Sequence, residues 1–376
     1  NRVELRCDHR VENLDDLFDQ GYQAVFIALG TCIPRALGIP GEDLPGVWKG
    51  VYFLKESNLG FESGRRPQVG NRVAVIGAGN VAVDCARTAL RLGAADVRVL
   101  YRRSRREMPA YDFEMRAAEI EGAKVELLTA PTRIVRREDG ALDLRLTRTR
   151  LGSLDAGGRP IPQPIPGSEY GMTVDTVLVA IGQLPGVSDT WNLGRNPDGS
   201  LTVEEGSLKT TRPGVFAGGD VVLGPQNIIT AIAQGRKAAR EIDRYLGGSG
   251  DIEEVLAPVP GPEMEYPDIH PHGKDCVAMA ELPPGDRTRS FEVVQQGYSE
   301  EEARDEALRC VRCDLWSLKG APKVWWKRRG LTPYWLGGDD RRSRAQDQSR
   351  ASPYRPYRPR YDHAPYVPDE YSPRDG

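Results

Sequence analysis

Three small residues at fixed spacing, Gly77, Gly79 and Ala82, have the chemistry to bring a backbone turn against a phosphate. They follow the β-branched run of residues 72–76, and residues 86–92 suit a helix. A strand, a tight turn and a helix with the spacing Gly-x-Gly-x-x-Ala are typical of a dinucleotide-binding unit. Gly77 permits the sharp turn, Gly79 has no Cβ to block a pyrophosphate, and Ala82 lets the helix pack close to the strand. Because glycine-rich turns are common, a purely structural turn is the alternative.

Two arginines at the end of the next expected strand, residues 96–101, indicate which nucleotide binds. An NAD site usually has an acid at this point, about 20 residues after the glycines, for the ribose 2′-hydroxyl. Asp96 begins the strand rather than ending it, and the end carries Arg102 and Arg103. Guanidinium groups match the oxygens of a 2′-phosphate. The sequence therefore predicts NADPH, against the alternative of a solvated basic loop.

Composition excludes several classes of protein. The 376 residues allow two domains with sizeable cores, and the net charge of −3 argues against a nucleic-acid-binding surface over the whole chain. No apolar run approaches the roughly 20 residues that a membrane helix needs. The six cysteines are scattered and only the last two are close in sequence, which favours a reducing cytoplasm over a disulfide framework. The chain opens at Asn1 in strand-like sequence, so we expect a fragment whose first part is missing.

The elements that must position these residues alternate between strand and helix, as in an α/β protein. Residues 22–31 and 174–182 are apolar runs ending at Gly30 and Gly182, which suits strands covered on both faces. We expect helices at 51–60, 111–121, 228–246 and 299–308, strands near 124–129, 131–137 and 142–150, and a hairpin tip at 152–168. The Tyr/Pro/Arg-rich residues 338–376 cannot bury a core, so we expect a disordered tail there.

Three segments together, 77–84, 101–110 and 216–220, resemble the small (β) subunit of NADPH-dependent glutamate synthase and related flavoprotein pyridine-nucleotide oxidoreductases. The resemblance covers roughly residues 1–246. It implies an α/β fold of interleaved FAD- and NAD(P)-binding Rossmann-like domains, with a parallel sheet in a three-layer ββα arrangement. It assigns residues 1–60 and 186–246 to the FAD-binding domain, 71–183 to the NADPH-binding domain, and 251–320 to a linker and a helix with Cys-x-x-Cys.

The resemblance also has departures. The family's first Gly-x-Gly-x-x-Gly, which holds the adenosine diphosphate of FAD, should lie upstream of residue 1. Thioredoxin reductase, a neighbour in fold, has a Cys-x-x-Cys pair inside its nicotinamide domain. This chain has only Cys85 there, which we interpret as a buried helix residue.

The resemblance implies the following cofactor-binding residues. Asp220 is expected to contact the ribityl and pyrophosphate region of FAD, and the helix after Asn227 to direct its positive end at the flavin. No catalytic residue is nominated, because hydride passes from nicotinamide C4 to flavin N5 without a side-chain acid or base. The full set is Gly77, Gly79, Asn80, Val81, Asp84, Arg102, Arg103, Gly182, Gly30, Gly219, Asp220, Asn227 and Ile228.

A Cys-x-x-Cys pair, Cys310 and Cys313, follows the expected helix at 299–308. In these flavoproteins such a segment is the entry to an iron–sulfur domain. A [4Fe–4S] cluster needs four thiolates as a rule, so a partner chain or a missing segment would have to supply the other two. The alternative is a helix end with two free thiols.

The sequence thus predicts a flavin-dependent oxidoreductase that transfers hydride from NADPH to FAD. Electrons would then pass to a partner domain, a subunit or an iron–sulfur centre. Glutamate synthesis, ferredoxin reduction and sulfur or formate metabolism all fit such a module. The alternatives are a non-catalytic NADPH-binding fragment and an interaction subunit that docks through the tail.

Overall fold

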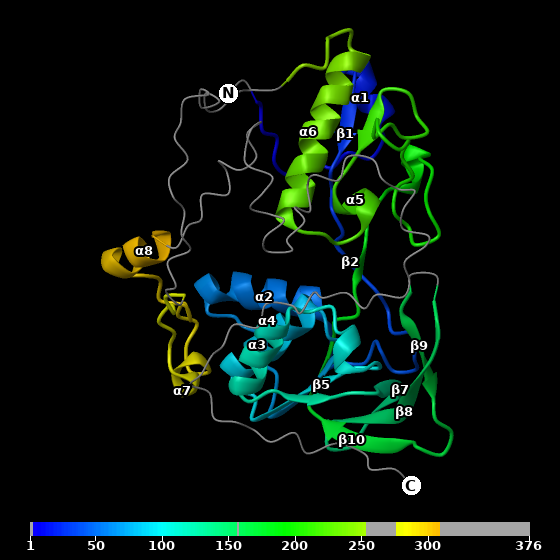
Figure 1. Cartoon of the computed structure of the whole chain (residues 1–376). Coiled ribbons are helices and arrows are strands. Elements are labelled where there is room, and N and C mark those ends of the chain that lie inside the picture. Colours follow the sequence, from blue (N-terminus) through cyan, green and yellow to red (C-terminus); the bar gives the residue numbers. More distant parts are fainter. Residues whose placement is uncertain (1–2, 156–157, 253–275, 309–376) are drawn as a thin grey trace, which may run out of the picture. The chain divides into compact units, whose positions relative to one another are not determined.

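The computed structural model describes residues 3–155, 158–252 and 276–308 (Figure 1). Cys310, Cys313 and the expected tail at 338–376 lie outside these residues. None of the described helices is long and apolar enough to cross a membrane.

A five-stranded parallel sheet forms the centre of the larger α/β unit, in the order β3-β11-β4-β5-β6. The middle strand β4 is buried from Val73 to Ile76. Both faces are covered, which explains why the strand is a continuous apolar run. The strands are β3 (Val47–Lys49), β4 (Arg72–Ile76), β5 (Asp96–Leu100), β6 (Lys124–Glu126) and β11 (Thr176–Val179).

Three helices cover one face of this sheet: α2 (Gly50–Ser63), α3 (Asn80–Arg91) and α4 (Asp112–Ile120) (Figure 1). Cys85 is fully buried and its thiol donates to the carbonyl of Gly50 at 3.6 Å, so α3 packs directly on the start of α2. Burial also raises the pKa of the Cys85 thiol, which leaves it protonated and inert. The short helix η1 (Arg105–Glu107) lies in the connection between β5 and α4.

An antiparallel sheet in the order β10-β8-β7, with β9 paired to β8, covers the opposite face. Leu142, Leu144 and Leu146 alternate along β8 and are fully buried against the parallel sheet. The unit therefore has helices, parallel sheet and antiparallel sheet in three layers, which confirms the predicted fold class. The antiparallel strands are β7 (Thr129–Arg136), β8 (Leu142–Leu154), β9 (Pro160–Pro164) and β10 (Tyr170–Val174).

Two details of this unit differ from the sequence expectations. The apolar run 174–182 is divided at Asp175 between β10 and β11, which belong to different sheets. The expected hairpin tip at 152–168 contains the last part of β8 and all of β9, so the hairpin is longer than its Gly/Pro content indicated.

A second core joins two distant parts of the chain. Strands β1 (Val25–Ile27) and β13 (Val215–Ala217) pair in parallel, and the cluster below them includes Leu14, Trp191 and Leu201. The extended apolar run 22–31 thus contributes only three strand residues. The helical elements of this part are α1 (Asp15–Asp19), η2 (Asp189–Trp191), α5 (Asp220–Leu223) and α6 (Ile228–Tyr245).

Short elements complete the described chain. Strands β2 (Ile33–Pro34) and β12 (Gln183–Leu184) pair antiparallel. Residues 276–308 contain α7 (Pro284–Arg287) and α8 (Glu300–Ala307). Ser299 caps α8: its hydroxyl accepts from the Glu302 N–H at 3.2 Å, and the Glu302 carboxylate accepts from the Ser299 N–H at 2.7 Å.

Candidate functional site

The turn after β4 carries the predicted glycines at the carboxyl edge of the parallel sheet. The Gly77 N–H donates to the carbonyl of Leu100 at 3.0 Å, and a Cβ on Gly77 would lie 2.1 Å from the carbonyl oxygen of Ala180. With φ at +125°, this position needs glycine for its backbone as well as for the close approach of the chain after β11. At Gly79, in contrast, an added Cβ would meet no atom within 4 Å. The turn is therefore tight at its first glycine and open at its second.

Helix α3 begins at this turn without a side-chain cap within the described residues. Gly79 is the N-cap residue, and Ala82 is fully buried against the sheet while Val81 packs partly into the same core. The side-chain oxygen of Asn80 accepts from the Tyr111 N–H at 3.3 Å, which ties the loop before α4 to the turn. An uncapped helix N-terminus beside open space is suited to an anion such as a pyrophosphate.

Asp84 lies one turn further along α3 on an exposed position. Desolvation of its carboxyl raises the pKa of Asp84, although the charge of Arg87 opposes this. On α4, desolvation followed by the charge of Asp84 raises the pKa of Glu114. Burial thus raises the pKa of both carboxyls, and the charge of Asp84 on α3 adds to the shift at Glu114 on α4.

The two arginines after β5 have different environments. Arg102 is exposed, and among the described residues its side chain has no hydrogen bond or ion pair. Arg103 is only 6% exposed; its Nε donates to the carbonyl of Pro160 at 2.7 Å and its guanidinium lies 3.7 Å from Asp155. Partial burial and repulsion from Arg103 and Arg159 lower the pKa of Arg102. Arg102 is therefore available to an anion, whereas the described contacts of Arg103 are within the chain.

Arg159, which the sequence analysis missed, also lies at the end of β5, close enough for its charge to act on Arg102. It comes from the hairpin of β8 and β9, and its guanidinium donates to the Tyr101 hydroxyl and to the Glu107 carbonyl, each at 3.4 Å. Nothing in the sequence around Arg159 marks it, because its position depends on how β9 pairs with β8.

Gly182 lies shortly after β11, which is the parallel neighbour of β4. Its φ is +112°, and its carbonyl accepts from the Arg35 N–H at 3.0 Å. Because carboxyl ends of parallel strands meet at one edge, Gly182 and the Gly77–Asn80 turn both lie at the carboxyl edge of this sheet.

The carboxyl ends of β1 and β13 form a second edge. The Gly218 N–H donates to the carbonyl of Ile27 at 3.1 Å, so the two strand ends are held together. Gly30 and Gly219 follow the two strands with φ of +66° and +73°, and a Cβ on either would meet no atom within 4 Å. Both glycines therefore border open space.

Asp220 and Asn227 begin the two helices that follow this edge. The Asp220 carboxylate is half-buried and accepts from the Gln226 N–H at 3.1 Å. The Asn227 side chain caps α6 by accepting from the Thr230 N–H at 2.9 Å. Ile228, the first residue of α6, is 78% exposed, so its side chain is accessible to a ligand, as the sequence analysis requires of a site residue.

A buried amide on α6 also faces this edge. The side-chain oxygen of Gln234 is buried without a hydrogen-bond partner among the described residues, and it lies 3.3 Å from the position that a Cβ on Gly218 would take. A buried unpaired acceptor is costly, and a ligand with a hydrogen-bond donor would satisfy it.

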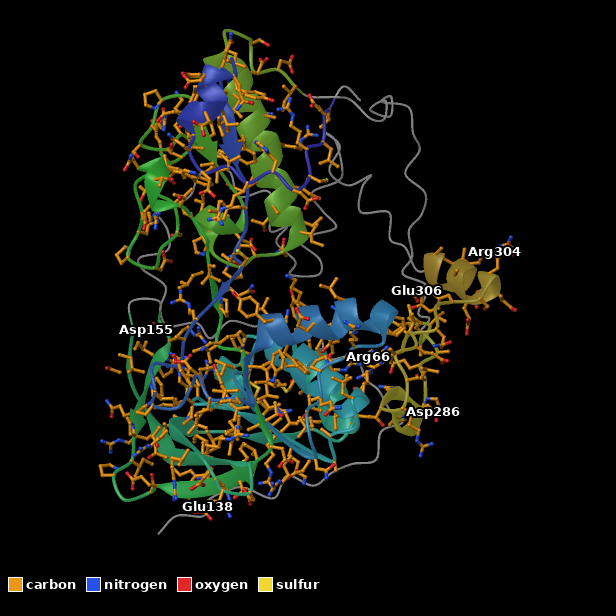
Figure 2. All side chains as sticks on the ribbon, turned by 180° about the vertical axis from the view of Figure 1, so that it is seen from behind. Arg66, Glu138, Asp155, Asp286, Arg304 and Glu306 are labelled. Atoms are coloured by element: carbon orange, nitrogen blue, oxygen red, sulfur yellow. The ribbon has the colours of Figure 1, made fainter. Side chains whose placement is uncertain are left out.

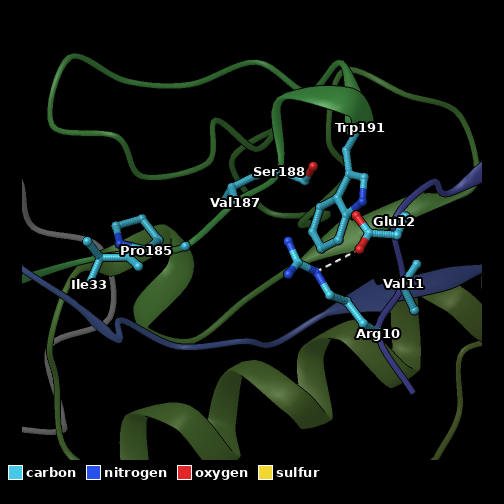
Figure 3. A pocket seen from close by; sticks show the side chains of 9 residues that line it. Arg10, Val11, Glu12, Ile33, Pro185, Val187, Ser188 and Trp191 are labelled. Atoms are coloured by element: carbon cyan, nitrogen blue, oxygen red, sulfur yellow. Dashed lines mark ion pairs between the residues drawn. The ribbon is translucent and has the colours of Figure 1, made fainter. Parts of the chain in front are cut away.

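A pocket of about 620 Å³ lies between residues 10–12 and 185–191 (Figure 3). Arg10 and Glu12 form an ion pair of 3.0 Å at its rim. The indole N–H of Trp191, which lines the pocket, is buried and has no acceptor among the described residues. The volume is in the range of about 300–1,000 Å³ that small-molecule sites occupy.

The described residues contain no group of three His, Cys, Asp or Glu side chains that could hold a metal ion. Cys310 and Cys313 lie outside them, so the cluster prediction stays a prediction. Among the described cysteines, Cys7, Cys32 and Cys85 are free thiols.

Comparisons with known proteins agree with this geometry. The sequence profile of the pyridine nucleotide-disulphide oxidoreductase family matches residues 2–235. The NADP(+)-dependent formate dehydrogenase subunit beta of Moorella thermoacetica is 40% identical over 326 residues, covering 83% of this chain and 45% of the relative. The NADPH-Fe(3+) oxidoreductase subunit beta of Geobacter sulfurreducens is 34% identical over 350 residues, covering 83% of this chain and 51% of the relative. The glutamate synthase [NADPH] small chain of Halomonas elongata is 39% identical over 256 residues, covering 65% of this chain and 53% of the relative.

The fold also resembles a solved structure, Mycobacterium tuberculosis FprA in complex with NADPH. The TM-score is 0.52 at 22% identity, over 62% of this chain and 66% of that one. The fold and the two strand-end edges define a nucleotide-binding oxidoreductase, and the chain belongs to the pyridine nucleotide-disulphide oxidoreductase family. It spans about half the length of the curated relatives it matches.

Proposed function

We propose that this chain is an NADPH-oxidising flavoprotein module of a larger oxidoreductase. It binds NADPH at the Gly77–Asn80 turn, binds FAD at the edge of β1 and β13, and passes electrons to a partner domain or subunit. The relatives named as beta subunits and small chains support the role of a subunit.

One observation carries the NADPH assignment: an open glycine turn lies at the end of one strand, and an arginine without a side-chain partner among the described residues lies at the end of the neighbouring strand. Gly79 leaves room for a pyrophosphate, and Arg102 stands at the end of β5, where the adenosine ribose lies in this kind of fold. A guanidinium without an acid partner has its charge available for a 2′-phosphate. A site for NAD would place a carboxylate there instead.

The residues of the second edge fit FAD. Gly30 and Gly219 leave space for the backbone to approach a ligand, and the Gln234 oxygen needs a donor. We propose that Asp220 accepts a hydroxyl hydrogen bond and that Asn227 and Ile228 border the flavin at the start of α6. When bound, FAD supplies an acceptor for the nicotinamide hydride. The chain's own residues orient the two nucleotides and exclude water, and none needs to move a proton.

We propose domain limits that differ slightly from those expected from the sequence. Leu37, Ile39 and Leu44 pack on the core between the parallel and antiparallel sheets, and the Ile134 N–H donates to the Pro40 carbonyl at 2.9 Å. Strand β3 pairs with β11 and α2 packs on α3, so residues from about 37 onward pack with the NADPH-binding residues 71–183. Residues before about 37 together with 186–246 would form the FAD-binding domain. The free thiols of Cys7, Cys32 and Cys85 favour a cytoplasmic location.

The test is anaerobic titration of the full chain, supplied with FAD, by NADPH and by NADH. Bleaching of the flavin absorbance band by NADPH, at lower concentration than by NADH, is the expected result. A protein that binds NADP⁺ but retains no flavin would instead be the non-catalytic alternative. Equal bleaching by the two nucleotides would overturn the assignment of NADPH.

A further inference from the structure

The end of β5 and the β8–β9 hairpin together form a basic surface. Arg102 comes from β5, and Arg159 comes from the turn between β8 and β9. Within the described residues neither guanidinium pairs with a carboxylate: Arg102 has no partner, and Arg159 donates only to the Tyr101 hydroxyl and the Glu107 carbonyl. Two adjacent arginines without acid partners repel each other, and a bound anion would relieve that repulsion.

The hairpin is held in this place by Arg103. Its Nε donates to the Pro160 carbonyl at 2.7 Å, and its guanidinium lies 3.7 Å from the Asp155 carboxylate (Figure 2 labels Asp155). Asp155 in turn accepts from the Arg159 N–H at 2.9 Å, and its own N–H donates to the Arg159 carbonyl at 2.8 Å. These bonds hold Pro160, the residue after Arg159, and the backbone of Arg159 itself.

A second bond ties β8 to the same loop. The Thr149 hydroxyl, which is buried, donates to the Arg102 carbonyl at 2.8 Å. Side chains alternate along a strand, so the next residue, Arg150, lies on the opposite face and is exposed. The face of the hairpin that carries Thr149 is therefore the one that meets the end of β5.

We propose that the β8–β9 hairpin completes the 2′-phosphate site, with Arg159 as a second ligand beside Arg102 and Arg103 as the positioning residue. This rests on the proposed binding of NADPH at the glycine turn. The roles of Arg102 and Arg103 then differ, whereas the sequence analysis expected both to bind the phosphate. Arg102 contacts the phosphate, and Arg103 acts by holding the hairpin in place. Selection of NADPH over NADH then depends on a residue of the β8–β9 hairpin as well as on the end of β5.

The test measures binding of 2′,5′-ADP and of 5′-AMP to the full chain by calorimetry, which requires neither flavin nor hydride transfer. Arg159→Ala should weaken 2′,5′-ADP by roughly 10- to 100-fold, as expected for one charge-assisted hydrogen-bonding group, and leave 5′-AMP unchanged. Arg150→Ala removes the same charge from the other face of the hairpin and should leave both affinities unchanged. Arg159 is exposed, so its loss should not impair folding.

Arg103→Met tests the positioning role. It should weaken 2′,5′-ADP in the wild-type background but add little in the Arg159→Ala background, because its effect passes through Arg159. Additive losses would show that Arg103 contacts the phosphate itself. Equal 2′,5′-ADP affinity of wild type and Arg159→Ala would overturn the role of Arg159. If wild type binds neither nucleotide, the proposed function itself fails.

Discussion

At the residue scale, Gly77 and Gly79 are required for different physical reasons although two positions separate them. Gly77 has a left-handed φ and its missing Cβ admits the Ala180 carbonyl, whereas Gly79 has φ of −92° and open space around it. The first glycine is needed for the backbone to fold into this turn, and the second leaves the space that we assign to the pyrophosphate.

We therefore predict that one alanine variant loses stability and the other loses nucleotide affinity. Gly77→Ala should lower the free energy of unfolding by about 2–5 kcal/mol, from backbone strain plus overpacking against Ala180. Gly79→Ala should change stability by less than about 1 kcal/mol but weaken NADP⁺ by roughly tenfold or more, since its Cβ occupies the space for the pyrophosphate. Urea denaturation and calorimetric titration of both variants check this. Loss of stability in Gly79→Ala would contradict the assignment.

Residue types and spacing were sufficient to locate the turn and the basic strand end, but not the directions of the side chains. The sequence treats Arg102 and Arg103 as equivalent. In the structure Arg103 bonds to Pro160, 57 positions away, while Arg102 stays exposed. Arg159 could not be found for the same reason, because only the pairing of β9 with β8 brings it to the end of β5.

At the element scale, Glu121 joins α3 to the end of α4. Its side chain is fully buried, and it lies 2.6 Å from Arg87 and 2.8 Å from Arg91. Desolvation alone would raise the pKa of Glu121, but hydrogen bonds and charge from both arginines outweigh it and hold the pKa below its usual value of 4.5. A buried carboxylate shared by two arginines is stable only while it is ionised.

Glu121→Gln should accordingly lower the free energy of unfolding by about 3 kcal/mol at neutral pH. Because the folded pKa is lower than the unfolded pKa, the stabilisation is present above about pH 4.5 and is lost as the pH falls through the folded pKa. Glutamine resembles the protonated acid, so the difference between wild type and variant should shrink in acid. Urea denaturation at several pH values measures this.

A surface pair provides the control for Glu121. Glu119→Gln, which removes the partner of Arg105, should change stability by at most about 1 kcal/mol. If the difference between Glu121→Gln and wild type did not depend on pH, the lowered pKa of Glu121 would be wrong.

The apolar runs predicted most elements of the parallel sheet but not the division at Asp175. Its carboxylate accepts from the N–H groups of Asn71 and Arg72 at 3.0 and 2.8 Å and pairs with the Arg72 guanidinium at 2.6 Å. Asp175 lies between β10 and β11, and its carboxylate binds the first residue of β4. This one side chain therefore fixes the point where the chain passes from the antiparallel to the parallel sheet. The sequence did show an acid, Asp175, inside an apolar run. It could not show why the acid is there, because its partner Arg72 lies about a hundred residues away.

At the scale of the whole molecule, the described residues form separate hydrophobic cores. Two lie on the two faces of the parallel sheet, and the third lies beneath β1 and β13. Sequence patterns could predict the first two because their strands are continuous apolar runs around a glycine turn. The third is built from short strands far apart in the chain, so the sequence indicated it only through its resemblance to a family.

This separation predicts how a nucleotide stabilises the molecule. NADP⁺ at about 100 times its dissociation constant adds about 2.7 kcal/mol to the unit that binds it. Hydrogen exchange of amides in β4, β5 and α3 should therefore slow by up to roughly 100-fold, while amides in β1 and β13, on the third core, keep their rates. Mass spectrometry of exchanged peptides, with and without NADP⁺, measures both sets at once.

The Gly79→Ala variant is the control for this experiment, because it should fold normally and show roughly tenfold less protection, or still less, at the same NADP⁺ concentration. Addition of FAD should give the reverse pattern, with protection at β1 and β13. If NADP⁺ slowed exchange equally in all strands, the three cores would unfold as one cooperative unit. NADP⁺ at the glycine turn and FAD at the other edge would then each protect both sets of strands, and their stabilising free energies would add.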